Sequence, residues 1–177
     1  ILIGMMASGK STIGRLLAKK LNMRFYDIDF IIEKKSKMKI HEIFKKKGES
    51  VFRHLEKKIT LTILNKNNCV ISLGGGAFLD NEVRKIALKS GNTVCLNWKA
   101  KTIIKRIRKN NKRPIALNLS NNEIKKLIVD RSKIYSEAKY KINCEKMTKL
   151  EIINTIINTL NLWMCKKLKL KQKINLT

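Results

Sequence analysis

The residues best suited to chemistry lie in a glycine-bearing stretch near the start of the chain. Residues 4–11 read GMMASGKS, which matches the phosphate-binding pattern G-x-x-x-x-G-K-S/T, known as the P-loop. In such a loop, backbone N–H groups and the start of the following helix face one anionic group. Lys10 would reach the β- and γ-phosphates of a nucleotide, and the Ser11 hydroxyl would bind Mg²⁺.

The segments beside this loop fit the motif. The apolar residues 1–3 predict the end of a buried strand, and Ile13, Leu16, Leu17 and Leu21 repeat at helical spacing after the loop. Strand, glycine loop and helix in this order is the context that a P-loop requires; the alternative is a chance match in a turn. Ala7 stands where glycine is common, and a positive φ there would cost on the order of 1 kcal/mol.

Two carboxylates follow the next short strand. Phe25-Tyr26 predicts an extended segment, in which residues two apart face the same way, so Asp27 and Asp29 are expected on one side. In a parallel α/β sheet, ligands bind at this end of the strands. The alternative is a pair of turn or cap residues.

Residues 30–65 carry apolar side chains at helical spacing, interrupted at Gly48. Arg53 follows two apolar residues, which places its start close to the boundary of the core. An arginine in that position needs an anionic partner. The sequence leaves two partners open, Glu56 or the carboxylate of a ligand.

A glycine triplet follows the next predicted strand. Residues 69–73 are mostly apolar and lead into Gly74-Gly75-Gly76, where a ligand can approach the backbone closely; the alternative is a flexible turn. The remaining elements are expected in order as follows: helix 81–89, strand 93–97, helix 100–109, polar loop 109–117, helix 122–135, strand 139–144 and helix 148–163.

This alternation of strands and helices predicts an α/β fold with three layers, in which helices cover both faces of a central parallel sheet of about five strands. A chain of 177 residues suits one domain, expected over residues 1–165, with a basic tail over 166–177. The polar loop is expected to act as a lid over the phosphates, or else to be a solvated surface loop.

The net charge of +27 has two interpretations. A positive chain can bind nucleic acid or an anionic membrane. However, the lysines are spread over the whole chain, and Asn and Ile are abundant as well, which indicates a compositional bias of the kind an AT-rich genome produces. We therefore expect no specific nucleic-acid partner and no membrane partner.

The four cysteines form no C-x-x-C pair, which indicates a reduced, intracellular protein. No stretch is long and apolar enough to span a membrane, and no signal peptide is seen. The chain starts inside its first predicted strand and without a Met, so we expect that it is a fragment at that end. Whether a targeting segment preceded this point stays open. We expect a cytoplasmic monomer.

Taken in order, these motifs resemble the shikimate kinase family, a small member of the nucleoside monophosphate kinase-like P-loop proteins. The resemblance rests on the P-loop, Asp27-Ile28-Asp29, Gly48-Glu49 with Phe52-Arg53, the glycine triplet, Arg113-Pro114, and Arg131 with Tyr135. It implies ATP-dependent phosphorylation of the 3-hydroxyl of shikimate, with Mg²⁺, in aromatic amino-acid biosynthesis.

The resemblance also implies roles for particular residues of this chain. The expected catalytic residues are Lys10, Asp27 and Arg113, with Ser11 and Asp27 at the Mg²⁺ ion. The expected ATP-binding residues are Ala7, Ser8, Gly9, Lys10, Ser11, Thr12, Arg106 and Arg113. The expected shikimate-binding residues are Asp29, Arg53, Gly74, Gly75, Gly76 and Arg131, within a helical region over 30–62 and below a lid over 109–120.

The chain departs from the family pattern at the nucleotide side. Besides Ala7, the lid reads Arg-Pro-Ile-Ala at 113–116 instead of Arg-Pro-Leu-Leu, and Asn143 and Lys149 stand where Asp and Pro are common. These departures bear on nucleotide affinity more than on reaction type. Two alternatives stay open: a gluconate- or nucleotide-type kinase of the same fold, and a P-loop binding protein that has lost catalysis.

Overall fold

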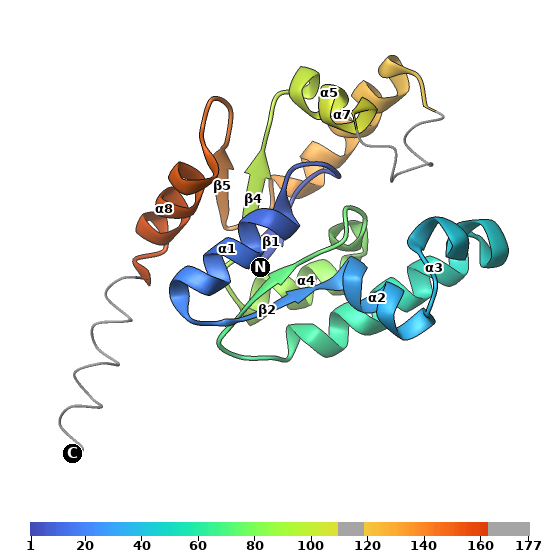
Figure 1. The fold of residues 1–177 in the computed structure, drawn as a ribbon, viewed down its shortest axis with the longest axis horizontal. Helices are drawn as coiled ribbons and strands as arrows, with labels where there is room; N and C mark the ends of the chain where they lie inside the picture. Colours follow the sequence, from blue (N-terminus) through green and yellow to red (C-terminus); the bar gives the residue numbers. More distant parts are fainter. Residues whose placement is uncertain (110–118, 163–177) are drawn as a thin grey trace.

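The structure, a computed structural model, describes residues 1–109 and 119–162. Its centre is a parallel sheet of five strands in the order β2-β3-β1-β4-β5 (Figure 1). The strands are β1 (Leu2–Ile3), β2 (Arg24–Asp27), β3 (Cys69–Ser72), β4 (Val94–Asn97) and β5 (Tyr140–Asn143). The predicted fold class is thereby confirmed. Because β1 is the middle strand, the P-loop that follows it lies between the ends of β3 and β4.

Helices cover both faces of the sheet. They are α1 (Lys10–Leu21), α2 (Ile28–Ser36), α3 (Ile40–Leu64), α4 (Asn81–Ser90), α5 (Ala100–Arg108), α7 (Asn121–Tyr135) and α8 (Lys149–Thr159), with a short 3₁₀ turn at Ala77–Leu79. Successive strand residues point to opposite faces, so Leu2 packs with α1 and α8 whereas Ile3 packs with the other helices. The three central strands β1, β3 and β4 are therefore buried on both sides, as their apolar runs predicted, whereas the edge strands β2 and β5 are partly exposed.

Side-chain caps fix where several helices begin. Ser120 and Glu123 form a reciprocal capping box at the start of α7, and Thr148 and Glu151 form another at the start of α8. The α8 cap sets the position of the residues around Thr148, which line the cavity described below.

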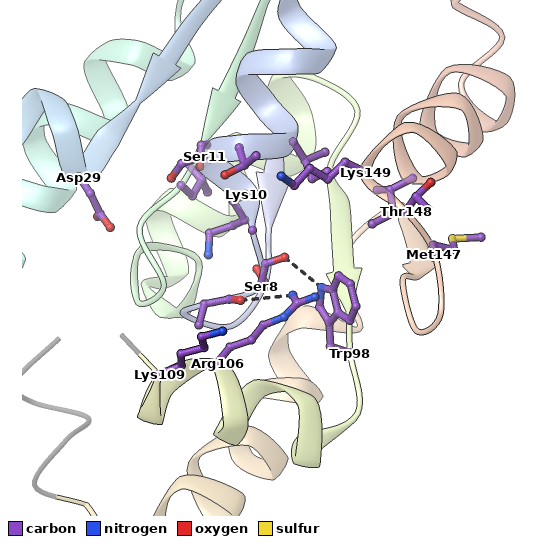
Figure 2. Close-up of a pocket in the computed structure, with 17 residues that line it drawn as sticks. Ser8, Lys10, Ser11, Asp29, Trp98, Arg106, Lys109, Met147, Thr148 and Lys149 are labelled. Atoms are coloured by element: carbon purple, nitrogen blue, oxygen red, sulfur yellow. Dashed lines mark hydrogen bonds between the residues drawn. The ribbon is translucent and has the colours of Figure 1, made fainter. Parts of the chain in front are cut away.

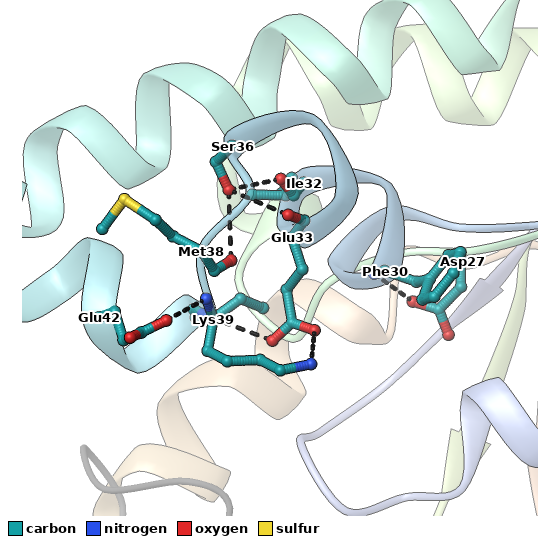
Figure 3. Close-up of polar contacts among 9 residues, drawn as sticks. Asp27, Phe30, Ile32, Glu33, Ser36, Met38, Lys39 and Glu42 are labelled. Atoms are coloured by element: carbon teal, nitrogen blue, oxygen red, sulfur yellow. Dashed lines mark hydrogen bonds and ion pairs between the residues drawn. The ribbon is translucent and has the colours of Figure 1, made fainter.

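The predicted helical region after β2 is divided into two helices. Helix α2 ends at Ser36 and α3 begins at Ile40, and Glu33 accepts hydrogen bonds from the Lys39 side chain and the Ile40 N–H, both at 3.2 Å (Figure 3). This break was not predicted. The interruption at Gly48 is confirmed, since Gly48 has a φ of 80° and a ψ of 169° inside α3.

Two predicted segments lie outside the described residues: most of the lid over 109–120, with Arg113, and the basic tail over 166–177. Helix α8 ends at Thr159, earlier than the helix predicted over 148–163. Among the described residues, none of the helices has the length and apolar character needed to cross a membrane.

Candidate active site

A cavity of about 830 Å³ opens over the P-loop, at the carboxyl ends of the strands (Figure 2). Its wall combines P-loop residues with side chains that follow β3 and β4 and with the start of α8. The lining residues are Ala7, Ser8, Gly9, Lys10, Ser11, Thr12, Ile13, Asp29, Ser72, Leu73, Trp98, Arg106, Lys109, Met147, Thr148, Lys149 and Ile152. All six predicted P-loop contacts over 7–12 therefore lie in one wall.

The P-loop backbone has the conformation that the motif requires. Ala7 has a φ of 60° and Gly9 a φ of 90°, and no side chain caps the N-terminus of α1. The N–H groups at the start of α1 are therefore not used by a capping side chain. Lys10 is buried, and its Nζ donates to the carbonyl oxygens of Gly4 at 2.9 Å and Met5 at 3.0 Å.

The two aspartates after β2 do not share one face, so the prediction from extended geometry was wrong. Asp27 is the N-cap of α2, and its Oδ1 accepts a hydrogen bond from the Phe30 N–H at 3.3 Å (Figure 3). Asp29 lies in the first turn of α2, because the helix begins directly after the cap. Among the described residues, Asp29 lines the cavity and Asp27 does not.

Arg53 is paired with two carboxylates of its own helix. Its Nη1 donates to Glu56 Oε2 at 2.7 Å, and its Nε and Nη2 donate to Glu49 Oε1 at 3.1 and 3.0 Å. The Glu56 side chain is 3% exposed, whereas that of Glu49 is 65% exposed. The guanidinium also lies near the Phe52 ring, 5.2 Å from its centroid. Glu56 is thus a partner of Arg53, and the Glu49 pairing was not foreseen.

The glycine triplet brings this charged cluster against the loop after β3. A Cβ at Gly74 would lie 2.1 Å from Glu56 Oε1 and 2.8 Å from Asp29 Oδ1. A Cβ at Gly76 would lie 2.3 Å from Arg53 Nη1. Only residues without a side chain allow these contacts, so the triplet is a site of close approach rather than a flexible turn.

Arg131 of α7 reaches the same loop from another direction. Its Nη1 donates to the Gly75 carbonyl at 3.2 Å, and the Tyr135 hydroxyl donates to the same oxygen. The buried Nε of Arg131 has no hydrogen-bond partner within the part of the chain that the structure describes. Helices α2, α3 and α7 and the loop after β3 therefore converge on one charged region.

The electrostatics of this region follow from burial and pairing. Burial raises the pKa of Glu56 above its usual range, and the Arg53 guanidinium acts in the opposite direction without cancelling that effect. Burial lowers the pKa of Arg53, but Glu56 and Glu49 outweigh it and hold the guanidinium firmly charged. Arg53 thus carries its full positive charge beside the glycine loop.

On the other side of the cavity, Arg106, one of the expected ATP-binding residues, lines the wall. Its Cζ is 3.6 Å from the centroid of the Trp98 ring, and its Nη1 donates to the Ala7 carbonyl at 3.5 Å. Sequence reasoning did not single out Trp98. Its place directly after a buried strand was a signal, because such ends meet the P-loop in a parallel sheet. Of the two departures at this end, Lys149 lines the cavity, whereas the Asn143 side chain accepts from the Glu145 N–H at 3.3 Å.

Comparison with known proteins gives a consistent result. A family model for shikimate kinase matches residues 6–161. The shikimate kinase of Persephonella marina is 42% identical over 156 residues, which are 88% of this chain and 94% of the relative. The crystal structure of shikimate kinase from Aquifex aeolicus has a TM-score of 0.81 at 39% identity and covers 90% of this chain and 94% of that chain.

A further solved structure, shikimate kinase from Acinetobacter baumannii in complex with shikimate, has a TM-score of 0.85 at 29% identity and covers 90% of both chains. Residues 6–11 of the P-loop, the glycine triplet and the arginines described above lie within the span of the family match. The chain therefore belongs to the shikimate kinase family.

Proposed function

We propose that this protein is a kinase that transfers the γ-phosphoryl group of ATP to the 3-hydroxyl of shikimate and releases ADP and shikimate 3-phosphate. Membership of the family supports the reaction, and the related A. baumannii enzyme is described in complex with shikimate. The observation that carries the proposal is the convergence of Asp29, Arg53 and Arg131 on one glycine loop beside the P-loop.

The carboxylate of shikimate would bind to the two arginines. A guanidinium offers a planar fork of N–H groups to a carboxylate. The buried Arg131 Nε–H could donate a hydrogen bond to an oxygen of the ligand. The Asp29 carboxylate, which faces the cavity, would accept hydrogen bonds from ring hydroxyls. The substrate would thus lie between the glycine triplet and the phosphate-binding loop.

The residues present fit a Mg²⁺ ion that arrives with the nucleotide. Magnesium prefers oxygen ligands and is commonly held by one or two protein oxygens together with phosphate oxygens. Ser11 offers a hydroxyl in the cavity wall, and Asp27, which caps α2 through Oδ1 and lies outside the lining, would offer its other carboxylate oxygen from the end of β2. The ion would neutralise charge on the phosphates.

The chain would contribute mainly position and charge. The hydroxyl oxygen of the substrate attacks the γ-phosphorus, the bond to the β–γ bridging oxygen breaks, and the hydroxyl proton passes to Asp27. Lys10 and Arg113 would offset the negative charge on the transferring group. Lys10 is buried at the P-loop, and Arg113 lies outside the described residues.

Release of ADP, followed with a coupled assay, tests the proposal. We expect ADP to form with shikimate and Mg²⁺, and to form slowly when gluconate or a nucleoside monophosphate replaces shikimate. Turnover with either of these would favour the other kinase types considered above. ATP binding without turnover of any acceptor would favour a P-loop protein that has lost catalysis.

Arg53→Ala and Arg131→Ala test the substrate side. Loss of one charge-assisted hydrogen bond costs roughly 1.5–3 kcal/mol, or about 10- to 100-fold in affinity. We therefore expect weaker shikimate binding by calorimetry, with ATP binding nearly unchanged. Thermal melts give the control. If the melting temperature falls and the affinities for shikimate and ATP fall with it, the arginines support the fold and do not bind the substrate.

We also propose that the protein is a cytoplasmic monomer without a nucleic-acid or membrane partner. Cys69, Cys95 and Cys144 are free thiols, which suits a reducing compartment. Burial raises the pKa of the Cys95 thiol to about 11 and that of Cys144 to about 12, which keeps both unreactive. Gel filtration tests the monomeric state, and localisation of the protein in cells tests the cytoplasmic location.

A further inference from the structure

Trp98 contacts the P-loop although it lies about 90 residues away in the sequence. It follows β4, which pairs with β1, so the end of one strand adjoins the loop that follows the other. The indole Nε1 donates to the Ser8 carbonyl at 2.9 Å, and the ring lines the cavity (Figure 2).

Arg106 of α5 adds a second contact beside the first. Its guanidinium lies over the Trp98 ring at 3.6 Å from the centroid, and its Nη1 donates to the Ala7 carbonyl at 3.5 Å. Two consecutive P-loop carbonyls are therefore bound by two side chains that also stack on each other. Ala7, which has a φ of 60°, lies at this point of the loop.

These bonds fix the direction of a neighbouring N–H group. In a trans peptide the C=O and the following N–H point in opposite directions. The Ser8 carbonyl points toward Trp98, so the Gly9 N–H points away from it. The N–H of the preceding peptide, at Ser8, is already bonded to the Met5 carbonyl at 3.1 Å. Gly9 is the N-cap of α1, the helix whose N-terminus faces the phosphates in a P-loop.

The Arg106 guanidinium and the Trp98 ring both line the cavity. Arg106 and Trp98 form one wall, and Met147, Thr148 and Lys149 form another (Figure 2). A flat cation held against an indole ring is ready to stack on a flat base without losing further side-chain freedom.

We propose that Trp98 is a positioning residue for the nucleotide, acting through two separable contacts. Its indole N–H orients the Ser8–Gly9 peptide toward the phosphates, and its ring face holds Arg106 flat against the base. The inference rests on the proposed function only in that the cavity binds a nucleotide.

Two substitutions separate the contacts. Trp98→Phe keeps an aromatic face but removes the N–H donor, whereas Trp98→Leu removes both. Binding of Mg-ATP, inorganic tripolyphosphate and shikimate is measured by calorimetry for each variant. Trp98→Phe should weaken ATP and tripolyphosphate alike, by about 2- to 10-fold, the effect of one hydrogen bond. Trp98→Leu should weaken ATP by a further factor of about 2 to 5, but not tripolyphosphate, which has no base.

Shikimate binding should stay within twofold in both variants. Tyr140→Leu, a loss of a partly buried aromatic residue on neighbouring β5, is the matched control for packing. A second readout is fluorescence: the chain has two tryptophans, so in a Trp163→Phe background the remaining emission reports Trp98 and should change when ATP is added, but not when shikimate is added.

Unchanged ATP and tripolyphosphate affinities in Trp98→Phe would overturn the proposal. The proposal would also be overturned if the affinities for ATP, tripolyphosphate and shikimate all fell together with the melting temperature. That is the pattern expected of the packing control Tyr140→Leu. If Trp98→Leu does not fold, the phenylalanine variant and the fluorescence still decide. Failure of the proposed function looks different: ATP binds to the native protein, but no shikimate is phosphorylated.

Discussion

At the scale of single residues, Ala7 adopts a φ of 60°, in the left-handed region that favours glycine. Ala7→Gly should therefore leave stability unchanged or raise it by up to about 1 kcal/mol, because relief of strain offsets the greater freedom of glycine in the unfolded chain. Ala18→Gly, in the interior of α1, is the control and should cost about 1 kcal/mol or more. Urea unfolding measures both, and equal losses would show that Ala7 is not strained.

In the proposed mechanism, Lys10 is the P-loop side chain that would place a positive charge on the phosphates. Lys10→Ala should abolish phosphoryl transfer while the protein stays folded, because the Lys10 hydrogen bonds to the Gly4 and Met5 carbonyls lie within its own loop. Turnover and circular dichroism are measured together. A folded variant with near-normal turnover would contradict this prediction and the proposed mechanism.

Gly74 offers a test of the close approach between the glycine loop and the charged cluster. Gly74→Ala would place a Cβ 2.1 Å from Glu56 Oε1, so the carboxylate must move and Arg53 with it. We expect at least about a tenfold loss of shikimate affinity. Gly91→Ala, where the added Cβ would meet Ile1 Cδ1 at 3.7 Å and φ is 179°, should bind shikimate normally. Calorimetric titration compares the two.

At the scale of elements, Asp80 joins α3 to α4. Its carboxylate caps α4 through the N–H groups of Glu82 at 2.9 Å and Val83 at 3.0 Å, and it pairs with Lys57 of α3 at 3.1 Å. Burial raises the pKa of Asp80, but the two N–H groups and Lys57 outweigh it, so the net pKa lies below its usual value of 3.8.

Asp80→Ala should therefore cost about 1 kcal/mol at neutral pH, the typical value of an N-cap. A lowered folded-state pKa gives stability that is complete above the unfolded pKa and is lost as pH falls through the folded one. The difference in the free energy of unfolding between wild type and Asp80→Ala should thus shrink below about pH 4. Asp80→Asn keeps a capping oxygen and should lose less. Urea unfolding at pH 7 and pH 3 measures all three, and a difference that grows in acid would contradict the assignment.

The elements also show how far sequence reasoning reached. The strands, the P-loop and the break at Gly48 were predictable, because apolar runs and glycine positions are local signals. The break before Ile40 was not, since it depends on bonds from Glu33 several residues earlier. Asp29 was misplaced because a cap at Asp27 starts a helix where an extended strand was assumed.

Contacts between distant segments were beyond the sequence. Nothing in the order of residues indicates that Trp98 binds the Ser8 carbonyl or that Arg131 binds that of Gly75. Glu56 was one of the two partners considered for Arg53. The sequence does not show that Glu56 is buried, because its burial depends on the packing of the glycine loop. Roles carried over from the family remain predictions until the variants above are measured.

At the scale of the whole molecule, the net charge of +27 predicts weak, salt-sensitive attraction to any polyanion. We expect binding to a random DNA duplex to fall at least about tenfold between roughly 50 and 200 mM salt, because the attraction depends on counterion release. Phosphorylation of shikimate should change far less over the same range. Fluorescence anisotropy with labelled DNA measures the first and the coupled assay the second. Sequence-selective DNA binding at about 150 mM salt would instead indicate a nucleic-acid function.

Four side chains of the site are held in the same way, because each donates a hydrogen bond to a main-chain oxygen. Lys10 binds two such oxygens, Trp98 and Arg106 one each, and Arg131 another. A main-chain oxygen survives almost any substitution at its own position. Mutation toward lysine, asparagine and isoleucine codons can therefore change the residues that supply these acceptors without removing an acceptor.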